Sequence, residues 1–468
     1  MSFATDSRRL LALAVPIALT QLAQVALTTT DTVMMGLLGT RSLAAGGLAI
    51  VLFNQLRTMG VGMVTAVGNQ VAAATARASE MDGAAGRPGR DSPGPAVREK
   101  VRDLVRAALV LATTAGIIGA LLMVGCGRAL VWLGQDPDVV RAARPILLAL
   151  APGLVPCLWF QVIRQYTVGM RRPSALVWIT VVSIAVNAAL NWGFIHGTAG
   201  LPRLGLAGIG LATSSVYVAT FAALYTVTRR DAVLAPMLSL RLWRARPATI
   251  RRLAGLGAPI AATYGSEAGF FSVVALLIGS LGASALAAHT VVNQLVYIVF
   301  QVTVGLSHAA SISVSQEIAR GRVADAGRAA RTALTHGAIL LGVLAVVYLA
   351  VPDLVLRPFL DPADHAATTI AVQLLAVAAV LQFADSAQNI AVGLLRGLDD
   401  TKAGFRMTLV GYWAVGLPVA WLIGRVLLPG AVGVWIGLAT GLTVTAVLLL
   451  RRFHRALAAR VESVAIAG

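Results

Sequence analysis

The feature that most constrains the fold of this sequence is its series of long apolar segments, separated by short polar gaps. An apolar segment of about 20 residues, wound as an α-helix, can cross the roughly 30 Å hydrocarbon core of a membrane. Inside lipid, only helices and closed barrels satisfy all of their backbone hydrogen bonds. The sequence therefore predicts an all-α, polytopic membrane protein with twelve transmembrane helices. We expect spans near residues 10–36, 45–76, 104–126, 138–168, 174–196, 206–228, 250–279, 284–318, 329–351, 366–395, 403–427 and 432–450.

Charge is scarce, and its placement predicts the topology. Only 12% of the residues are charged, against about 25% in soluble proteins. The net charge of +18 comes from Lys and Arg in the gaps, so we expect no nucleic-acid partner. Of 38 basic residues, 29 lie on the side of the N-terminus and 7 on the other, with Arg57 and Arg164 inside spans. The positive-inside rule then predicts that both termini are cytoplasmic, in the inner or plasma membrane.

The two halves of the chain repeat. Shifting the first half by 243 residues superimposes a proline and three glycines, and a five-residue identity recurs farther on at a shift of 227. The pairs are Pro16 with Pro259, Gly36 with Gly279, Gly39 with Gly282, Gly62 with Gly305, and Ile209–Thr213 with Ile436–Thr440. Because each half holds six spans, the halves share one orientation and are related by a pseudo-two-fold axis along the membrane normal. We expect an N-lobe at 1–228, a cytoplasmic linker at 229–249, a C-lobe at 250–468, and a mobile loop at 78–99.

Three acidic residues lie deep in apolar spans: Asp31, Glu267 and Asp385. A carboxylate at the centre of a membrane costs at least about 2.5–3.5 kcal/mol, so it must face a cavity, find a partner or take up a proton. One interpretation is structural hydrogen bonding alone. The interpretation we favour is that these acids carry a proton or a cation, because such relays need groups that change charge.

Other deep residues support this interpretation or are explained by packing. Asn187 and Asn191 lie on one helix face, where their amides either assist an acid or a cation or join helices. Pro16 and Pro259 each remove a helix hydrogen bond, which makes a hinge or a static kink. Arg57 either pairs with a deep acid or extends to the membrane interface, and the same choice holds for Arg164. No nucleotide-binding loop or catalytic cluster is present, so we expect neither an enzyme nor a cofactor.

The sequence resembles the multidrug and toxic compound extrusion (MATE) transporters, and within them the bacterial NorM-like branch. The likeness runs over nearly the whole chain. It is carried by Pro16–Gly39 with Asp31, by Pro259–Gly282 with Glu267, by Leu286–His289, by Asp385 with Gly393–Thr401, and by Asn187 and Asn191.

The resemblance implies a monomer with two lobes that exports organic cations while Na⁺ or H⁺ flows inward. It assigns the acid at Asp31 to the N-lobe, and it assigns Glu267 and Asp385 to the C-lobe, where they would bind the coupling ion, possible Na⁺ included. Some relatives carry a tyrosine one turn before the Asp385 position. Here that place holds Leu381, which puts a tyrosine oxygen at this cation site in doubt.

Two other functions compete. A lipid-linked sugar flippase of a related superfamily would need a cavity rich in Arg and Lys, whereas the deep charges here are mainly acidic. An intramembrane enzyme would need a clustered catalytic set, which the sequence does not offer.

Overall fold

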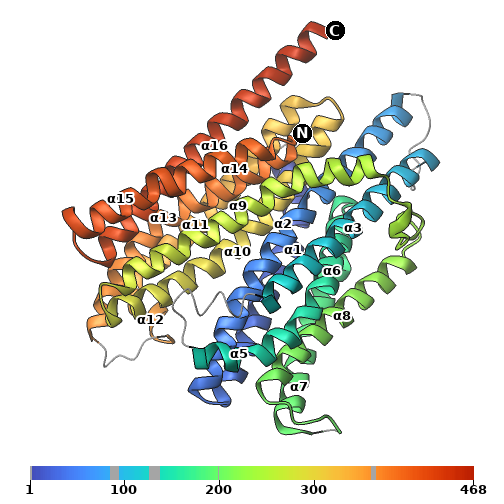
Figure 1. Ribbon diagram of the computed structural model, residues 1–468. Helices are drawn as coiled ribbons and strands as arrows, with labels where there is room; N and C mark the ends of the chain where they lie inside the picture. The colour runs from blue at the N-terminus through green and yellow to red at the C-terminus, as the bar shows by residue number, and fades with distance from the viewer. Residues whose placement is uncertain (1–2, 85–93, 126–136, 199, 360–364, 468) are drawn as a thin grey trace. The chain divides into compact units, whose positions relative to one another are not determined.

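The computed structural model describes residues 3–84, 94–125, 137–198, 200–359 and 365–467, and its regular elements are helices (Figure 1). The α-helices are α1 (Phe3–Leu37), α2 (Thr40–Ala84), α3 (Pro95–Gly125), α5 (Pro137–Leu150), α6 (Leu154–Gly169), α7 (Ser174–His196), α8 (Leu206–Arg230), α9 (Pro247–Gly279), α10 (Ala283–Ala319), α11 (Val323–Ala350), α12 (Pro352–Leu356), α13 (His365–Gly397), α14 (Thr401–Leu409), α15 (Leu417–Leu422) and α16 (Ala431–Ala467). Within these ranges, 12 helical stretches are long and apolar enough to cross a membrane, and each coincides with a predicted span. The predicted all-α, twelve-span fold is confirmed.

The predicted mobile loop at 78–99 is wrong at both ends. The second span continues as helix to Ala84, and α3 already begins at Pro95. Ala78, Glu80, Met81 and Ala84 are good helix formers, which favours helix after residue 77 in spite of the polar residues among them. Pro95 is suited to the first turn, where a missing N–H leaves no hydrogen bond unmade. The middle of the predicted loop, 85–93, lies outside the described residues.

Two spans change their helical type along their length. The fourth is divided into α5 and α6 by the 3-10 turn η1 (Ala151–Gly153). The eleventh passes from α14 into the π-helix η4 (Val410–Gly416), then into α15 and a second π segment, η5 (Ile423–Leu427). Pro418 is the second residue of α15 and cannot donate to the carbonyl four residues earlier, which favours the wider π winding before it. Single-turn π segments are frequent at functional sites.

The internal repeat is visible in the backbone. After α1, the N–H of Gly39 donates to the carbonyl of Gly36 at 3.1 Å, and after α9, Gly282 donates to Gly279 at 3.3 Å. Gly39 and Gly282 have φ angles of 97° and 121°, which L-residues with side chains rarely adopt. The matched glycines of the sequence therefore build the same turn twice.

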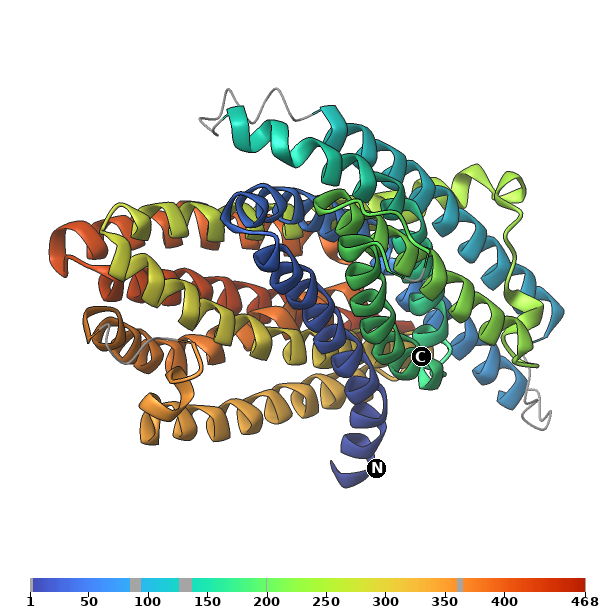
Figure 2. The same ribbon diagram turned by 90° about the horizontal axis from the view of Figure 1, so that it is seen from below.

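The described chain divides into two compact units that do not follow chain order strictly. One unit comprises Leu19–Ala261, and the other comprises Met1–Ala18 with Ala262–Gly468. In the first, α2 packs against α3 and α6, and α7 packs against α8. In the second, α13 lies beside α10 and α16 in both ribbon views (Figures 1 and 2). We call them the N-unit and the C-unit; the lobe limits expected from the sequence stay a prediction.

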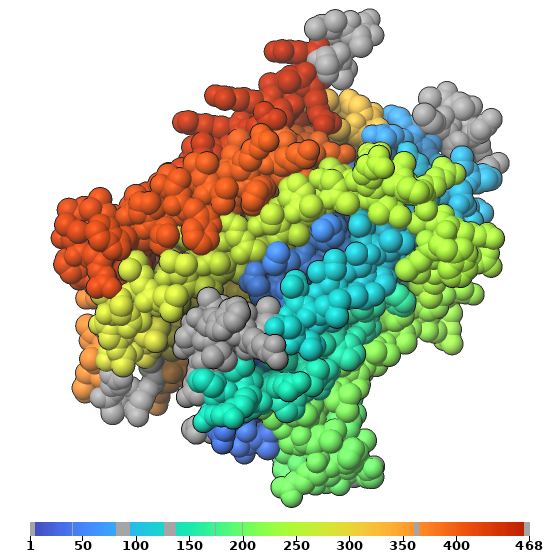
Figure 3. Space-filling view, in the orientation of Figure 1, coloured from blue at the N-terminus to red at the C-terminus, as the bar shows by residue number. Residues whose placement is uncertain are grey.

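Large apolar side chains are exposed along the outer helix faces. Trp178 of α7 is 74% exposed, and in the C-unit Trp421 of α15 and Leu427 of η5 are 55% and 69% exposed. Figure 3 shows the region of α15 at the surface of the C-unit. Exposed large apolar side chains on helices long enough to cross a membrane suit faces that contact lipid.

Candidate functional site

Asp31 lies in a buried polar cluster of the N-unit. It is only 4% exposed, near the end of α1, and faces Asn187 and Asn191 of α7 and Thr213 of α8. The amide nitrogen of Asn191 donates to Oδ1 of Asp31 at 2.8 Å, and the hydroxyl of Thr213 donates to Oδ2 at 2.8 Å. Both carboxylate oxygens therefore have a donor. Hydrogen bonds to a charged acceptor of this kind are roughly twice as strong as neutral ones.

The partners of Asp31 are themselves linked. The second amide hydrogen of Asn191 reaches Oδ1 of Asn187 at 3.0 Å, and the nitrogen of Asn187 lies 3.4 Å from the Thr213 hydroxyl. Thr213 has one proton, which it can direct to Asp31 or to the carbonyl of Ile209 at 3.0 Å. The oxygen of Asn191 is buried without a hydrogen-bond partner among the described atoms. The cluster can therefore rearrange when the charge on Asp31 changes.

The structure brings together the three N-lobe residues that the sequence singled out, and it adds Thr213. The spacing of Asn187 and Asn191 predicted a shared helix face, but not the element that this face meets. Thr213 was overlooked as a partner, although it ends the five-residue segment that recurs in the second half.

Glu267 and Asp385 lie in the C-unit, on α9 and α13. Asp385 is buried and Glu267 is half-buried, and the charge of Glu267 acts on Asp385; that both acids face one cavity stays a prediction. The hydroxyl of Tyr412 donates to Oε1 of Glu267 at 3.4 Å and also hydrogen-bonds Gln388. Oδ1 of Asp385 and Oε1 of Gln388 are buried and have no hydrogen-bond partner in the described part of the chain. The C-unit cluster thus has acceptors in excess.

Leu381 stands where some relatives carry a tyrosine, but Tyr412 supplies a tyrosine oxygen near the acids from another helix. It is fully buried, stacks on Phe270 at 4.8 Å between ring centroids, and projects from the π-helix η4. A tyrosine oxygen is therefore present beside Glu267, supplied by a different helix from the one expected. Helical periodicity could not place Tyr412 beside Glu267, because π winding changes which side chains share a face.

The matched prolines lie inside continuous helices. Pro16 falls within α1 and Pro259 within α9. The border between the two compact units follows each proline by two residues, after Ala18 in α1 and after Ala261 in α9. Both helices thus pass from one unit to the other directly beyond a residue that lacks an N–H for the helical hydrogen-bond ladder; the hinge at these prolines stays a prediction.

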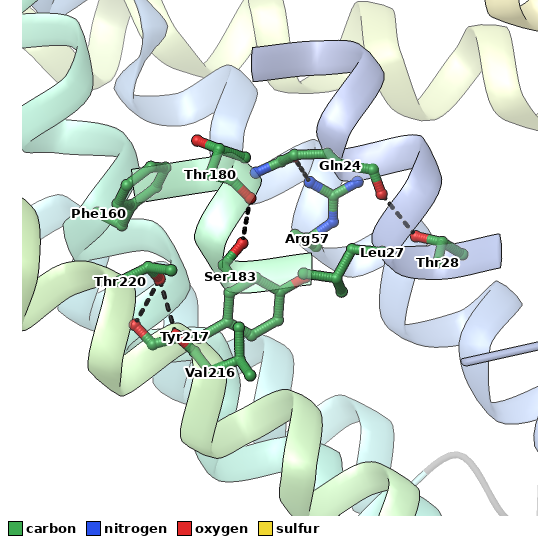
Figure 4. Close-up of a pocket in the computed structure, with 10 residues that line it drawn as sticks. All are labelled: Gln24, Leu27, Thr28, Arg57, Phe160, Thr180, Ser183, Val216, Tyr217 and Thr220. Atoms are coloured by element: carbon green, nitrogen blue, oxygen red, sulfur yellow. Dashed lines mark hydrogen bonds between the residues drawn. The ribbon is translucent and has the colours of Figure 1, made fainter. Parts of the chain in front are cut away.

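The two deep arginines have amide partners. Arg57 donates to Oε1 of Gln24 at 3.0 Å and to Oδ1 of Asn54 at 3.3 Å. Arg164 donates to Oε1 of Gln161 at 2.9 Å. Arg57 also lines a small pocket of the N-unit (Figure 4).

Comparison with known proteins agrees with this geometry. The family profile MatE matches residues 94–193 and 259–422, more than half of the chain. A probable multidrug resistance protein NorM from Pseudomonas aeruginosa is 39% identical over 454 residues, which cover 96% of this chain and 89% of that protein. A protein of the same description from Pseudomonas putida is 36% identical over 96% of this chain and 94% of its own length.

The fold has close counterparts among solved structures. The eukaryotic MATE transporter AtDTX14 superimposes with a TM-score of 0.83 at 19% sequence identity, covering 99% of both chains. At this identity the likeness concerns the fold alone. Together with the family profile and the curated relatives, it leads to one conclusion: the chain belongs to the MATE family of membrane transporters, with NorM proteins as relatives.

Proposed function

We propose that this protein is a multidrug efflux antiporter, which exports organic cations while Na⁺ or H⁺ moves inward through Asp31, Glu267 and Asp385. Both termini would be cytoplasmic, and the protein would lie in the inner or plasma membrane. The names of the NorM relatives support drug export. The observation that carries the proposal is that each compact unit buries an acid inside apolar helices, Asp31 in one and Asp385 in the other, with Glu267 half-buried in the second.

The C-unit cluster supports binding of the coupling ion. Two ionised carboxylates in one apolar interior repel each other, and a proton or a cation between them relieves that repulsion. The unpartnered oxygens of Asp385 and Gln388 and the hydroxyl of Tyr412 are neutral or anionic acceptors. Such an all-oxygen set fits Na⁺, and its carboxylates equally fit H⁺.

The N-unit cluster supports a switch that depends on charge. Protonation of Asp31 would weaken the two charge-assisted hydrogen bonds from Asn191 and Thr213. Thr213 would then turn its proton to the carbonyl of Ile209, which is already within reach. Asp31 and Pro16 share α1, so loosening the contacts of Asp31 would let that helix bend at the proline.

The test is ethidium accumulation in cells that express the protein. Glu267→Gln and Asp385→Asn keep size and hydrogen bonding but remove charge. Each should abolish efflux while expression remains normal. Asp353→Asn is the control, because Asp353 is an exposed acid of the same unit. Normal efflux from both deep variants would refute the proposal. Imposing a Na⁺ or a pH gradient separately on proteoliposomes then identifies the ion.

A further inference from the structure

Three basic side chains gather at one end of the N-unit, on three different helices. Arg77 of α2, Lys100 of α3 and Arg252 of α9 are all exposed, and we call them the basic cluster. Among the described residues, the charges that act on Lys100 are those of Arg77 and Arg252, both positive. Like charges repel, so their convergence costs free energy that an anion from outside the chain would offset.

Two hydrogen-bonded contacts fix the helices that carry these side chains. The carboxylate of Asp103 in α3 accepts from the backbone N–H of Arg246 at 3.0 Å and from the hydroxyl of Thr249 at 2.5 Å. One turn farther along α9, Arg252 donates to Oε1 of Gln70 in α2 at 2.8 Å. The first turns of α9 are therefore joined to both α3 and α2.

The spacing along α2 and α3 places the other two cations beside this junction. Lys100 precedes Asp103 by three residues, so both lie on one face of α3. Arg77 follows Gln70 by seven residues, about two turns, so both lie on one face of α2. In each helix, the residue that contacts the start of α9 and the cation thus share a face.

The acid beside this cluster is bonded elsewhere. Glu99 pairs with Arg102 at 2.7 Å and with Arg106 at 2.9 Å. Lys100 and Arg77 have no hydrogen-bond or ion-pair partner in the part of the chain that the structure describes. Two of the three cations are therefore left for a ligand.

The basic cluster lies where apolar helix gives way to polar chain. Arg77 directly follows the second predicted span, Lys100 precedes the third by one turn, and Arg252 lies in the first turn of the seventh. In a bilayer this is the level of the lipid headgroups. The positive-inside rule accounts for basic residues on this side, but not for their convergence on three packed helices. A guanidinium fork matches the oxygens of a phosphate, and an ammonium group adds a point charge.

We propose that the basic cluster binds the phosphate headgroup of an anionic phospholipid, whose acyl chains lie along the neighbouring apolar helix faces. The lipid supplies the negative charge that the described neighbours do not, and it joins α2, α3 and α9 at the membrane surface. A free phosphate ion offers the same charge, but a lipid also fits the position at the edge of the apolar spans. The inference concerns binding and depends neither on transport nor on the coupling ion.

The test is a lipid titration of the purified full chain in detergent micelles, followed by native mass spectrometry. The probes are phosphatidylglycerol and phosphatidylcholine with identical acyl chains, and wild type should bind one phosphatidylglycerol more tightly than phosphatidylcholine. The triple variant Arg77→Gln, Lys100→Gln, Arg252→Gln should weaken phosphatidylglycerol binding about 100-fold, since each basic residue near an anionic lipid contributes about a factor of five. Its binding of phosphatidylcholine should stay the same.

A matched triple variant, Arg229→Gln, Arg230→Gln, Arg241→Gln, changes three exposed arginines of the same unit on the same side of the membrane. It removes as much charge, yet it should weaken phosphatidylglycerol binding less than about fivefold, the value of one residue near the lipid. Arg77→Gln alone breaks no hydrogen bond to a described residue and should cost about fivefold, which separates lost charge from misfolding.

Three results would overturn the inference. Equal losses in the two triple variants would mean that the lipid responds to the overall charge of this side. Equal binding of both lipids by wild type would mean that there is no site for an anionic headgroup. Displacement of phosphatidylglycerol by inorganic phosphate at physiological concentration would assign the cluster to the free ion, whereas retention of the lipid supports the assignment to phospholipid.

Discussion

Replacing Gly62 or Gly305 by alanine should separate two helices at places that the internal repeat matches. A Cβ atom added at Gly62 of α2 would lie 2.7 Å from Cα and 2.8 Å from N of Ala261 in α9. One added at Gly305 of α10 would lie 2.7 Å from both N and Cβ of Ala18 in α1. The repeat relates the two contacts. Adding 243 to Gly62 gives Gly305, and subtracting 243 from Ala261 gives Ala18, so each half makes the same glycine–alanine contact. Each contact falls two residues beyond a matched proline.

The magnitude follows from these distances. Carbon atoms in ordinary contact are about 3.5–4.0 Å apart, so each helix pair must open by about 1 Å. Overpacking of this kind costs about 1–3 kcal/mol, and the upper part of the range applies because backbone atoms cannot rotate away. Alanine regains about 1 kcal/mol of helix propensity. We therefore expect a net loss of about 1–2 kcal/mol for either variant.

Gly47→Ala is the control in the same helix as Gly62. No atom lies within 4 Å of a Cβ placed at Gly47, so this variant should gain up to about 1 kcal/mol. Unfolding in mixed micelles, followed by tryptophan fluorescence, measures the difference, and ethidium efflux measures the effect on cycling. If Gly62→Ala is as stable as Gly47→Ala, the contact is not tight and the reasoning fails.

Three further outcomes are expected. Reporters fused after Gly468 and inserted within 86–90 should both read cytoplasmic, and a periplasmic signal from either would overturn the topology. Tyr412→Phe keeps the ring but removes the hydroxyl, so the half-saturating concentration of the coupling ion should rise about tenfold, the value of one hydrogen bond; an unchanged value would exclude this hydroxyl as a ligand. The pKa of Asp231 lies below its usual range. Burial alone would raise this pKa, but hydrogen bonds from two backbone N–H groups and the charge of Arg172 lower it by more. Asp231→Ala should therefore lower stability at neutral pH, by an amount that vanishes as pH falls through that depressed pKa; a loss that persists in acid would contradict this.

Apolarity and charge predicted the spans well, and predicted the polar segments poorly. The physics of lipid leaves few alternatives for a long apolar segment, which explains the agreement over all the spans. Residues 78–84 are polar and still helical, because helix propensity and not hydropathy decides where a helix ends in water. The π winding at 410–416 was not among the expectations, although Pro418, which favours it, is visible in the sequence.

The candidate site was predicted only as far as local periodicity reaches. Asn187 and Asn191 share a face by spacing, but Thr213 comes from another helix and could be placed only by the fold. Thr440 is the residue of the second half that matches Thr213. Its hydroxyl donates to the carbonyl of Ile436 in its own helix at 2.9 Å, so the recurring segment alone could not predict that Thr213 would bind an acid. The threonine of this segment thus donates to a carboxylate in the first half and to a carbonyl of its own helix in the second.

The two acidic clusters differ in a way that a double-mutant cycle can measure. Asp31 has a donor at each oxygen, whereas Oδ1 of Asp385 has none among the described atoms, and Gln388 bonds Tyr412 instead. Replacing Asp31 and Asn191 by leucine, singly and together, should therefore give a coupling energy of about 1.5–3 kcal/mol, since each single change leaves a buried polar group unmatched.

The same cycle on Asp385 and Gln388 should give less than about 0.5 kcal/mol, because no hydrogen bond joins them. Unfolding free energies of the two sets of variants decide between the outcomes. Equal coupling energies in both cycles would show that both acids are held by hydrogen bonds of similar strength. That result would remove the physical reason for proposing a switch at Asp31 and ion binding at Asp385. Strong coupling at Asp31 alone means that its charge is held by the protein's own donors. Asp385, by contrast, has an oxygen that the described residues leave without a donor, which is the condition for taking up an ion.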